Sequence, residues 1–416
     1  MRNTIILHNK HWKNKYTNLY NREVLEKLLK FLSVRQIIAL SGIRRSGKTT
    51  VFKLLINHLI DSGVDSKEIL YINLDDPFFS DICKNSKNLY QLLEQSKVIT
   101  GKSVKYLFLD EVQNVNEWEK FVKAIYDNDT VKKIFVTGSN SSLLNGEFAS
   151  LLSGRYIDTT IYPLSFKEVM RFYGINSYFE LLDNKAKVLN ILDNLLEYGS
   201  FFEVLNTEIK REIILSYYDT VIFKDCIGNR KIKNPKTFKE IAHFIISNST
   251  NIYSYNSVAK ALNSNEHTVK NFISYLEEAY LLKEIKNFSF SLKKQIKSNK
   301  KTYIIDNSFL AQTSFRFSKN HGKLLENLVF TELIKKDYEV YFYNENFECD
   351  FIAKKDNKLI AIQVCYELDN FNRQRKLSAL KKLPFNTNDK FVLTYNQNEE
   401  IEGIKVISFW EYFFEL

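Results

Sequence analysis

The segment from residue 36 to residue 50 reads QIIALSGIRRSGKTT. It opens with a short apolar run, which predicts a buried strand. The loop that follows extends from Gly42 to Thr49 and fits the pattern GxxxxGK followed by Ser or Thr. A helical pattern then begins at Lys48 and is predicted to continue to about Ile60. This order of strand, glycine-containing loop and helix is typical of a phosphate-binding loop.

The spacing within this loop has a chemical reason. Gly42 and Gly47 allow backbone N–H groups to turn inward toward phosphate oxygens, and the following helix directs its positive N-terminus at the same anion. Lys48 is expected to reach the β- and γ-phosphates, and the Thr49 hydroxyl is expected to ligate Mg²⁺. The predicted ATP-binding residues are Gly42, Ile43, Arg44, Arg45, Ser46, Gly47, Lys48, Thr49 and Thr50. The two arginines of this set either contact the nucleotide or face solvent or a partner.

Two acidic residues follow a second apolar run. Residues 106–109 read YLFL, and Asp110 and Glu111 come directly after them. We expect Asp110 to hold Mg²⁺ together with Thr49, and Glu111 to orient and deprotonate the attacking water. An acidic pair at a strand end is often only a helix cap. Beside a phosphate-binding loop, however, hydrolysis is the favoured interpretation.

Two amide side chains near these acids have two interpretations each. Asn140 follows the next apolar run, residues 134–137, and either contacts the γ-phosphate or the water or belongs to a plain turn. Gln113 follows Glu111 by two positions and either binds the same water or caps a helix. The predicted catalytic set in this part of the chain contains Lys48, Glu111 and Asn140.

The apolar runs recur along the first part of the chain. They lie at residues 36–40, 69–74, 106–109 and 134–137, with helical stretches between them. Apolar strands that alternate with helices predict a parallel sheet covered on both faces, which is an α/β fold. From residue 166 to about residue 229 the pattern becomes helical.

The composition excludes several classes of protein. At about 150 residues per domain, the 416 residues predict two to four domains. Hydrophobic residues make up 44% and charged residues 26%, which excludes wholesale disorder. No run of about 18 apolar residues is present, so no membrane-spanning helix is expected. The four cysteines lie far apart and form no CxxC pair, which favours reduced thiols in a cytoplasmic protein.

The charge is strongly positive. Lys and Arg number 59 against 49 Asp and Glu, a net charge of +10. This excess favours a polyanionic partner such as nucleic acid or an acidic lipid surface. A lysine-rich solvated surface explains it equally well.

Further motifs accompany the loop. They are GIRRSGKTT at 42–50, LDEVQNVNEWEKF at 109–121, VTGSNSSLL at 136–144, LLSGRY at 151–156, IYPLSFKEV at 161–169, YYDTVIFKDCIG at 217–228 and TYIIDNSFL at 302–310. Together they resemble the AAA+ ATPases of a prokaryotic family whose members carry an uncharacterised C-terminal domain. The resemblance covers nearly the whole chain. One departure is Phe202 in GSFFEVL, where the family usually has Pro.

This resemblance implies ATP hydrolysis with Mg²⁺ and an oligomer. AAA+ ATPases often use an arginine from a neighbouring subunit to stabilise charge on the γ-phosphate. The catalytic candidate is Arg155 in LSGRY, and the alternative for this residue is an ordinary ion pair. No clear arginine lies on a predicted lid helix.

Three predicted helices between residues 238 and 282, with Ser264 as an N-cap, are followed by a predicted hairpin between residues 285 and 305. This order resembles a winged-helix domain, which implies either DNA binding or a structural, protein-binding module. On the DNA-binding interpretation, the major groove is contacted by His267, Thr268, Lys270 and Asn271. Phosphates are contacted by the wing lysines Lys286, Lys293, Lys294, Lys297, Lys300 and Lys301.

The last part of the chain resembles the PD-(D/E)XK nuclease fold. Glu326 lies on a predicted helix and Asp350 on a predicted strand, which matches the first two acidic positions. The third element reads Gln363-Val-Cys365. Gln363 ligates a metal only weakly, and Cys365 cannot replace the charge of the usual lysine. The favoured interpretation is therefore a degenerate domain that packs, dimerises or docks a partner.

We predict a cytoplasmic, Mg²⁺-dependent AAA+ ATPase that acts on or with DNA through a winged helix, with a protein partner as a further option. The alternatives are an ATP-gated DNA- or protein-binding regulator with very slow turnover and an ATP-licensed nuclease. The predicted domains are the P-loop ATPase core at 1–165, a helical lid at 166–232, a winged helix at 233–310 and a degenerate α/β restriction-endonuclease-like domain at 311–416.

Overall fold

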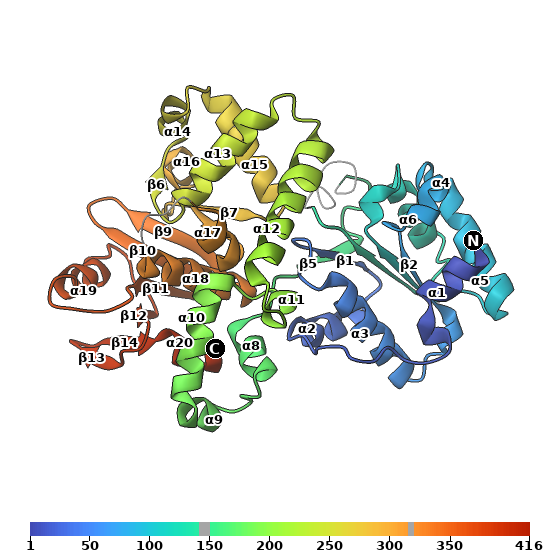
Figure 1. The fold of residues 1–416 in the computed structure, drawn as a ribbon, viewed down its shortest axis with the longest axis horizontal. Coiled ribbons are helices and arrows are strands. Elements are labelled where there is room, and N and C mark those ends of the chain that lie inside the picture. Colours follow the sequence, from blue (N-terminus) through green and yellow to red (C-terminus); the bar gives the residue numbers. More distant parts are fainter. Residues whose placement is uncertain (141–149, 315–319) are drawn as a thin grey trace. The chain divides into compact units, whose positions relative to one another are not determined.

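The computed structural model describes residues 1–140, 150–314 and 320–416. These form two compact units, Met1–Tyr162 and Pro163–Leu416, which are described separately (Figure 1). In the described residues, no helix combines the length and apolar character that crossing a bilayer requires.

The first unit is built on a five-stranded parallel sheet in the order β2-β3-β4-β1-β5. The strands are β1 (Ile37–Ser41), β2 (Ile69–Asn73), β3 (Tyr106–Asp110), β4 (Lys133–Thr137) and β5 (Tyr156–Thr160). The predicted α/β fold with a parallel sheet is therefore confirmed. Because the strands are parallel, the loops after β1, β3 and β4 leave the sheet at the same edge.

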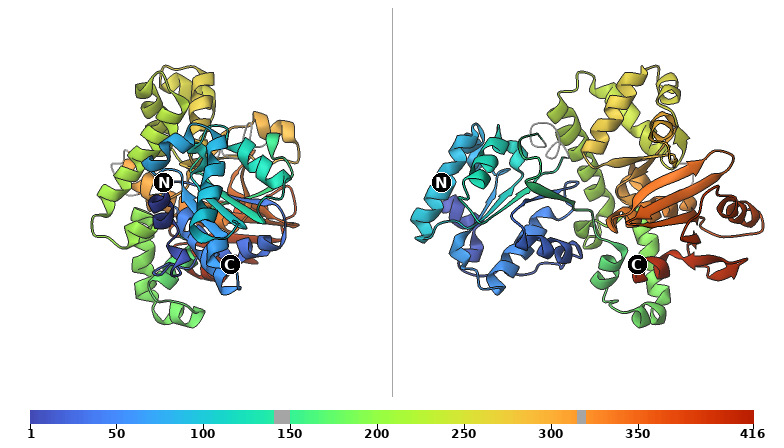
Figure 2. Two further views of the ribbon diagram at one scale, coloured as in Figure 1. Left: turned by 90° about the vertical axis from the view of Figure 1, so that its right-hand side faces the viewer. Right: turned by 180° about the vertical axis from the view of Figure 1, so that it is seen from behind.

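Helices cover both faces of this sheet (Figure 2). Alternate residues of β1 point to opposite faces, with Ile37 in one core cluster and Ile38 in the other. On the second face, the Phe108 and Phe135 rings stack with centroids 4.1 Å apart, and Phe52 meets Phe108 edge-on at 5.1 Å. The helices are α1 (Arg2–His8), α2 (Val24–Lys30), α3 (Lys48–Asp61), α4 (Ser80–Cys83), α5 (Leu89–Thr100) and α6 (Trp118–Asp127).

Side chains from the N-terminal segment form hydrogen bonds with backbone groups on the outer edge of β2. Asn9 Nδ2 donates to the carbonyl oxygen of Tyr71 (2.9 Å), and Asn9 Oδ1 accepts from the Tyr71 backbone N–H (2.7 Å). Trp12 Nε1 donates to the carbonyl oxygen of Ile69 (2.8 Å). An edge strand otherwise presents unpaired backbone groups. These hydrogen bonds fix the N-terminal segment against the sheet.

The second unit begins with helices, as the pattern after residue 166 predicts. They are α8 (Phe166–Phe172), α9 (Tyr178–Asp183), α10 (Lys185–Tyr198), α11 (Phe202–Leu205) and α12 (Lys210–Thr220), which continues into a π-helical stretch (Val221–Gly228). Capping boxes start two of them, at Ser165 with Glu168 and at Ser177 with Glu180.

A three-helix segment with a small antiparallel sheet follows. Its elements are α13 (Pro235–Ser247), β6 (Ile252–Tyr253), α14 (Tyr255–Ala261), α15 (Glu266–Glu278), β7 (Leu282–Lys286), α16 (Leu292–Lys297) and β8 (Lys300–Ile304). The sheet has the strand order β6-β8-β7. Asn265, and not Ser264, caps α15, because Asn265 Oδ1 accepts a 2.8 Å hydrogen bond from the Thr268 N–H.

The last part contains a mixed six-stranded sheet in the order β13-β14-β12-β11-β10-β9. Its strands are β9 (Glu339–Asn344), β10 (Glu348–Lys355), β11 (Lys358–Val364), β12 (Asp389–Thr394), β13 (Glu399–Ile401) and β14 (Ile404–Ser408). The helices are α17 (Asn307–Thr313), α18 (His321–Lys335), α19 (Arg373–Lys381) and α20 (Phe409–Glu415). Strands β10 and β11 pair antiparallel, whereas β11, β12 and β14 are parallel.

Candidate functional site

The phosphate-binding loop connects β1 to α3. Gly42 and Gly47 have φ values of 137° and 97°, which favour glycine. A Cβ at Gly42 would lie 2.2 Å from the carbonyl oxygen of Ile161, so no side chain fits there. Lys48 is buried, and its Nζ donates to the carbonyl oxygens of Gly42 (2.9 Å) and Ile43 (3.1 Å). The ammonium group is therefore held inside the loop.

The other predicted nucleotide contacts differ in exposure. Arg45 is exposed, with a left-handed φ of 67°. Arg44 and Thr50 are half-buried, and Ser46 is buried. Exposure alone does not separate a nucleotide contact from a solvent-facing role for the two arginines, so their part in binding stays a prediction.

Arg22 supports the loop and was not identified from the sequence. Its Nη1 donates to the carbonyl oxygen of Ser46 (2.7 Å), and its Nη2 donates to that of Tyr162 (2.8 Å). The side chain is only 6% exposed, and a Cβ at Gly47 would come within 2.8 Å of Nη1. Arg22 precedes α2, far from the loop motif, and no local pattern marks it.

Asp110 lies at the end of β3 beside the loop. Its Oδ2 accepts hydrogen bonds from the hydroxyls of Thr49 (2.7 Å) and Tyr71 (3.0 Å), and its Oδ1 accepts from the Thr137 hydroxyl. The residue is 1% exposed. Burial raises the pKa of this carboxyl, although the hydroxyl hydrogen bonds oppose the shift. Because no positive charge accompanies this buried carboxylate among its neutral hydroxyl partners, binding of a cation beside it would be energetically favourable.

This geometry fits a magnesium ion chemically. The Thr49 hydroxyl and the Asp110 carboxylate are oxygen donors in direct contact, and oxygen is the ligand that Mg²⁺ prefers. Tyr71 and Thr137 were missed because they come from the strands that flank β3. Only the strand order brings their hydroxyls to Asp110.

Glu111 is linked to two polar side chains. Its φ is 57°, and its backbone N–H donates to Thr137 Oγ1 (2.9 Å). Gln113 Nε2 donates to Glu111 Oε2 (2.5 Å) and also to Ser139 Oγ (3.3 Å). Gln113 therefore contacts the predicted catalytic carboxylate. The contact with Ser139 was not predicted.

Asn140 follows β4 and is 3% exposed. It stands next to Ser139, so the structure brings it to the same edge of the sheet as Glu111, and residues 141–149 lie outside the described residues. Whether it contacts the γ-phosphate or the water stays a prediction.

Arg155 directly precedes β5, at the end of the sheet opposite to the end that carries the phosphate-binding loop. Its carbonyl oxygen accepts from the backbone N–H of Ile37 at the start of β1 (2.8 Å). Its Nε donates to Asp127 Oδ1 (3.1 Å), an ion pair that is partly exposed. The structure therefore does not bring Arg155 to the phosphate-binding loop of its own chain. A catalytic role requires a second subunit and stays a prediction.

A second acid-containing cluster lies in the last part of the chain. Asp350 on β10 is 5% exposed, and its Oδ2 accepts from Lys376 Nζ (2.6 Å) and the Val364 N–H (2.7 Å). Lys376 also donates to Gln363 Oε1 (2.9 Å). Burial favours a raised pKa for Asp350, but the ammonium groups of Lys376 and Lys301 hold the pKa below its usual range.

The helix acid Glu326 belongs to the same cluster. It accepts from the Tyr303 hydroxyl (2.6 Å) and from Lys301 Nζ (3.3 Å), which also pairs with Glu348 (2.6 Å). Lys301 is 1% exposed. Burial disfavours its charge, but the surrounding carboxylates raise its pKa above the usual value.

Two lysine ammonium groups thus already offset most of the negative charge of the three carboxylates in this cluster. Sequence reasoning missed Lys376, because it comes from α19 and not from the strand position held by Cys365. A divalent ion would have to share Asp350 and Glu326 with two ammonium groups, which electrostatic repulsion disfavours. Among the residues with described positions, no group of three or more His, Cys, Asp or Glu side chains is arranged to hold a metal ion.

Two lysines of the predicted wing do not face solvent, which corrects that prediction. Lys300 is 6% exposed, and its Nζ donates to the carbonyl oxygens of Gln295 (3.2 Å) and Ile296 (3.0 Å). Lys301 points into the acid cluster. Both lie on β8, the central strand of its sheet, where side chains on both faces are covered. The other four predicted wing lysines, Lys286, Lys293, Lys294 and Lys297, are exposed.

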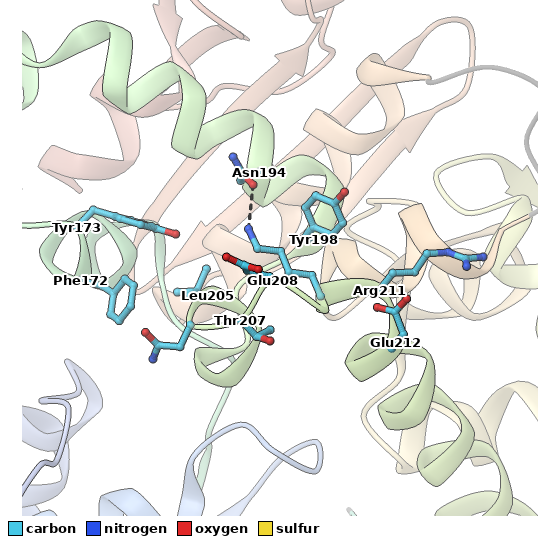
Figure 3. Close-up of a pocket in the computed structure, with 11 residues that line it drawn as sticks. Phe172, Tyr173, Asn194, Tyr198, Leu205, Thr207, Glu208, Arg211 and Glu212 are labelled. Carbon is cyan, nitrogen blue, oxygen red and sulfur yellow. Dashed lines mark hydrogen bonds between the residues drawn. The ribbon is translucent and has the colours of Figure 1, made fainter.

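An open pocket of about 950 Å³ lies between the helices at the start of the second unit (Figure 3). Lys210 donates to Asn194 Oδ1 (3.0 Å), and its Nζ lies 5.1 Å from the centre of the Tyr198 ring. Acidic and basic side chains, including Glu208 and Arg211, line it together. This mixture favours no single class of ligand.

Three family models match the chain. The AAA domain matches residues 34–170, the domain of unknown function DUF8612 matches 189–320, and the domain of unknown function DUF4143 matches 321–412. The Aeropyrum pernix ORC1 protein, solved in complex with DNA, is 12% identical, with 79% of this chain and 97% of that chain covered. Its TM-score of 0.34 is too low to carry an argument.

Two full-length relatives are more informative. The uncharacterized protein MJ1544 of Methanocaldococcus jannaschii is 32% identical, and the match covers 96% of this chain and 92% of the relative. An uncharacterized protein of Haemophilus influenzae is 30% identical, with coverage of 92% and 95%. The chain belongs to the family of these two proteins, and its residues 34–170 match the AAA domain.

Proposed function

We propose that the protein binds ATP with Mg²⁺ at the phosphate-binding loop, hydrolyses it, and uses the nucleotide cycle to act on DNA. The observation that carries this proposal is the 2.7 Å hydrogen bond between Thr49 Oγ1 and Asp110 Oδ2. It joins the loop after β1 to the acids after β3, so one nucleotide–metal complex can contact both.

Each residue has a distinct role in this proposal. Lys48 leaves the loop carbonyls and binds the β- and γ-phosphates. Thr49 and Asp110 hold Mg²⁺, which neutralises phosphate charge when bound. Glu111 takes the proton of the attacking water. Gln113 donates to Glu111 Oε2, which orients the carboxylate, and the other carboxylate oxygen can accept the hydrogen bond from the water.

Nucleotide binding tests the loop assignment. Lys48→Ala should weaken binding of a fluorescent ATP analogue by at least about 100-fold, because it removes the charge that faces the phosphates. Lys97→Ala, which removes an exposed lysine from α5, is the matched control and should leave nucleotide affinity close to that of the wild type. Equal affinity in Lys48→Ala and wild type would contradict the assignment.

We further propose that residues 233–310 form a winged helix that contacts DNA. The order α13, β6, α14, α15, β7 and β8 with an antiparallel β6-β8-β7 sheet supports this assignment. On α15, His267 and Lys270 are exposed near the helix N-terminus, and four exposed lysines follow near the hairpin. Affinity for a DNA duplex should fall steeply as salt rises. Affinity that is independent of salt would contradict phosphate contacts.

A second candidate function is an ATP-gated regulator with very slow turnover. The hydrogen bond from Gln113 to Glu111 Oε2 favours it, because it engages one oxygen of the carboxylate that should bind water. If this contact limits turnover, Gln113→Ala should hydrolyse ATP faster than wild type. A slower variant would instead assign Gln113 to positioning the water.

A further inference from the structure

A basic groove lies on the first unit, outside the phosphate-binding loop. Its volume is about 1030 Å³, and its walls come from the N-terminal segment, α3, β2 and the end of α5. The lysines that line it are Lys10, Lys13, Lys15, Lys53 and Lys67. No acidic residue is among the lining residues that the structure describes. Lys15 is ion-paired with Asp61 at 2.5 Å, so the positive charge that a polyanion requires comes from Lys10, Lys13, Lys53 and Lys67.

Aromatic side chains stand among these lysines. Trp12, Tyr16 and Tyr71 line the groove, and Trp12 and Tyr16 are half-buried. Lys53 Nζ lies 5.5 Å from the centre of the Tyr16 ring. Lysines with interleaved aromatic rings can bind phosphates and stack unpaired bases at the same time. A duplex keeps its bases stacked inside, so the rings favour a single strand.

The walls of the groove are anchored to the sheet and to α3. Asn9 and Trp12 bind the outer edge of β2 through the hydrogen bonds described above. The Tyr16 N–H donates to Asn57 Oδ1 (3.0 Å), and Asn57 Nδ2 donates back to the Tyr16 carbonyl oxygen (2.8 Å). A site that is formed before binding loses little conformational entropy when its ligand binds.

The groove also touches the ATP site. Tyr71 lines it, and the Tyr71 hydroxyl donates to Asp110 Oδ2 (3.0 Å). Lys53 lies on α3 one turn beyond Thr49, which donates to the same oxygen. A ligand in the groove would therefore contact two elements that position Asp110.

We propose that this groove binds single-stranded nucleic acid, and that Tyr71 transmits occupancy to Asp110 and changes the rate of ATP turnover. The lysines contact the phosphodiester chain, and the half-buried rings of Trp12 and Tyr16 stack against its bases, whereas Tyr71 is 5% exposed and forms the floor. The coupling to turnover rests on the proposed ATPase function, whereas the binding does not. The groove is distinct from the DNA contact proposed for residues 233–310.

Tryptophan fluorescence tests the binding directly. Of the three tryptophans, Trp118 is 4% and Trp410 is 1% exposed, whereas Trp12 is half-buried in the groove wall. A thymidine oligonucleotide of about 20 residues should quench the fluorescence of the full-length protein in a saturable manner. Trp12→Phe should lose this quenching. No saturable quenching in the wild type, or undiminished quenching in Trp12→Phe, would overturn the proposal.

Charge reversal tests the groove against the rest of the surface. Lys13→Glu together with Lys67→Glu should lower oligonucleotide affinity by at least about tenfold at low salt. Lys87→Glu together with Lys97→Glu makes the same charge change on exposed lysines of the first unit that do not line the groove. This control should keep the affinity. An equal loss in both double variants would overturn the assignment to the groove.

Two competitors identify the ligand class. A duplex of the same length and a chain of inorganic polyphosphate carry the phosphates without unpaired bases. Both should displace the oligonucleotide at least about tenfold less effectively, because they lose base stacking. Polyphosphate that competes equally would make the groove a general polyanion site, and a duplex that competes equally would exclude the single-strand assignment.

The coupling needs a separate readout. Saturating oligonucleotide should change ATP turnover by about fivefold or more in the wild type. Tyr71→Phe should keep the oligonucleotide affinity and lose this response, since it removes the hydroxyl that donates to Asp110. A response that persists in Tyr71→Phe would overturn the coupling. If the protein has no ATPase activity at all, the fluorescence titration still decides the binding.

Discussion

Asp110 and Asp350 are both buried aspartates at strand positions, yet the hydrogen-bond donors around Asp110 are neutral and those around Asp350 include a positive charge. Asp110 accepts hydrogen bonds from three neutral hydroxyls, and its pKa is raised. Asp350 accepts from the Lys376 ammonium, and its pKa is lowered. A buried carboxylate is costly unless a positive charge accompanies it. Asp110 is therefore suited to bind a metal ion, whereas Asp350 is already paired with the Lys376 ammonium.

Stability should show the largest difference between the two sites. Asp350→Ala leaves the buried ammonium of Lys376 without its carboxylate partner, which should cost about 3–5 kcal/mol of unfolding free energy. Asp110→Ala removes a carboxylate with no ammonium bound to it and should cost far less. Urea unfolding monitored by far-ultraviolet circular dichroism measures both. Equal losses of unfolding free energy in the two variants would contradict the difference between the two environments.

Catalysis should depend on the two aspartates in the opposite sense. Asp110→Asn should lower ATP turnover by about 100-fold or more, because it removes the charge that holds the metal. Asp350→Asn should leave turnover unchanged, since Asp350 belongs to the second unit and accepts hydrogen bonds there from Lys376 and the Val364 N–H. Phosphate release under saturating ATP measures both. A loss of turnover in Asp350→Asn would contradict the division of roles.

Much of the candidate ATP site could be proposed from the sequence because its motifs are local. Gly42, Lys48 and Thr49 lie within one loop, and Asp110 and Glu111 end one strand, so spacing alone identifies them. The outer contacts are not local. Tyr71 and Thr137 reach Asp110 only through the strand order, and Arg22 reaches the loop from a segment without any motif.

The second cluster shows how a local motif can mislead. The sequence has Cys365 where a lysine is usual, which predicts a site without an ammonium group. Lys376 supplies one from a neighbouring helix, a placement that strand spacing cannot predict. Lys301 seemed a surface lysine because few acids are near it in sequence. Its partners, Glu326 and Glu348, come from later elements.

Stability should also respond to pH with opposite signs at the two sites. The raised pKa of Asp110 means that the folded state holds this proton more tightly than the unfolded state. Its contribution to stability therefore falls as pH rises from the ordinary pKa of 3.8 toward the raised value. The lowered pKa of Asp350 means that its contribution is present above 3.8 and is lost as pH falls toward the lowered value.

Two variants separate these contributions. Against wild type, Asp110→Asn should gain relative stability as pH rises from 3.8 through the raised pKa of Asp110. Asp350→Asn should lose relative stability as pH rises through the lower window, from the lowered pKa to 3.8. Urea midpoints at each pH supply the data. The same sign in both variants would contradict the contrast.

The smallest expected effect concerns the metal preference of the second cluster. Lys376→Met removes the ammonium from Asp350 and Gln363, so Mn²⁺ should raise the thermal midpoint of this variant by about 2–4 °C. The wild type should show no such shift and should not nick plasmid DNA with Mg²⁺ or Mn²⁺. Nicking by the wild type that disappears in Asp350→Ala would revive a nuclease function.

The central claim is that the loop after β1 and the acids after β3 form one site for ATP hydrolysis. The most direct measurement compares ATP affinity and ATP turnover in the wild type and Glu111→Gln. We expect equal affinity, because the phosphate-binding loop is intact, and a loss of turnover of about 100-fold or more, because the base is gone. Equal turnover in the two proteins would contradict the claim.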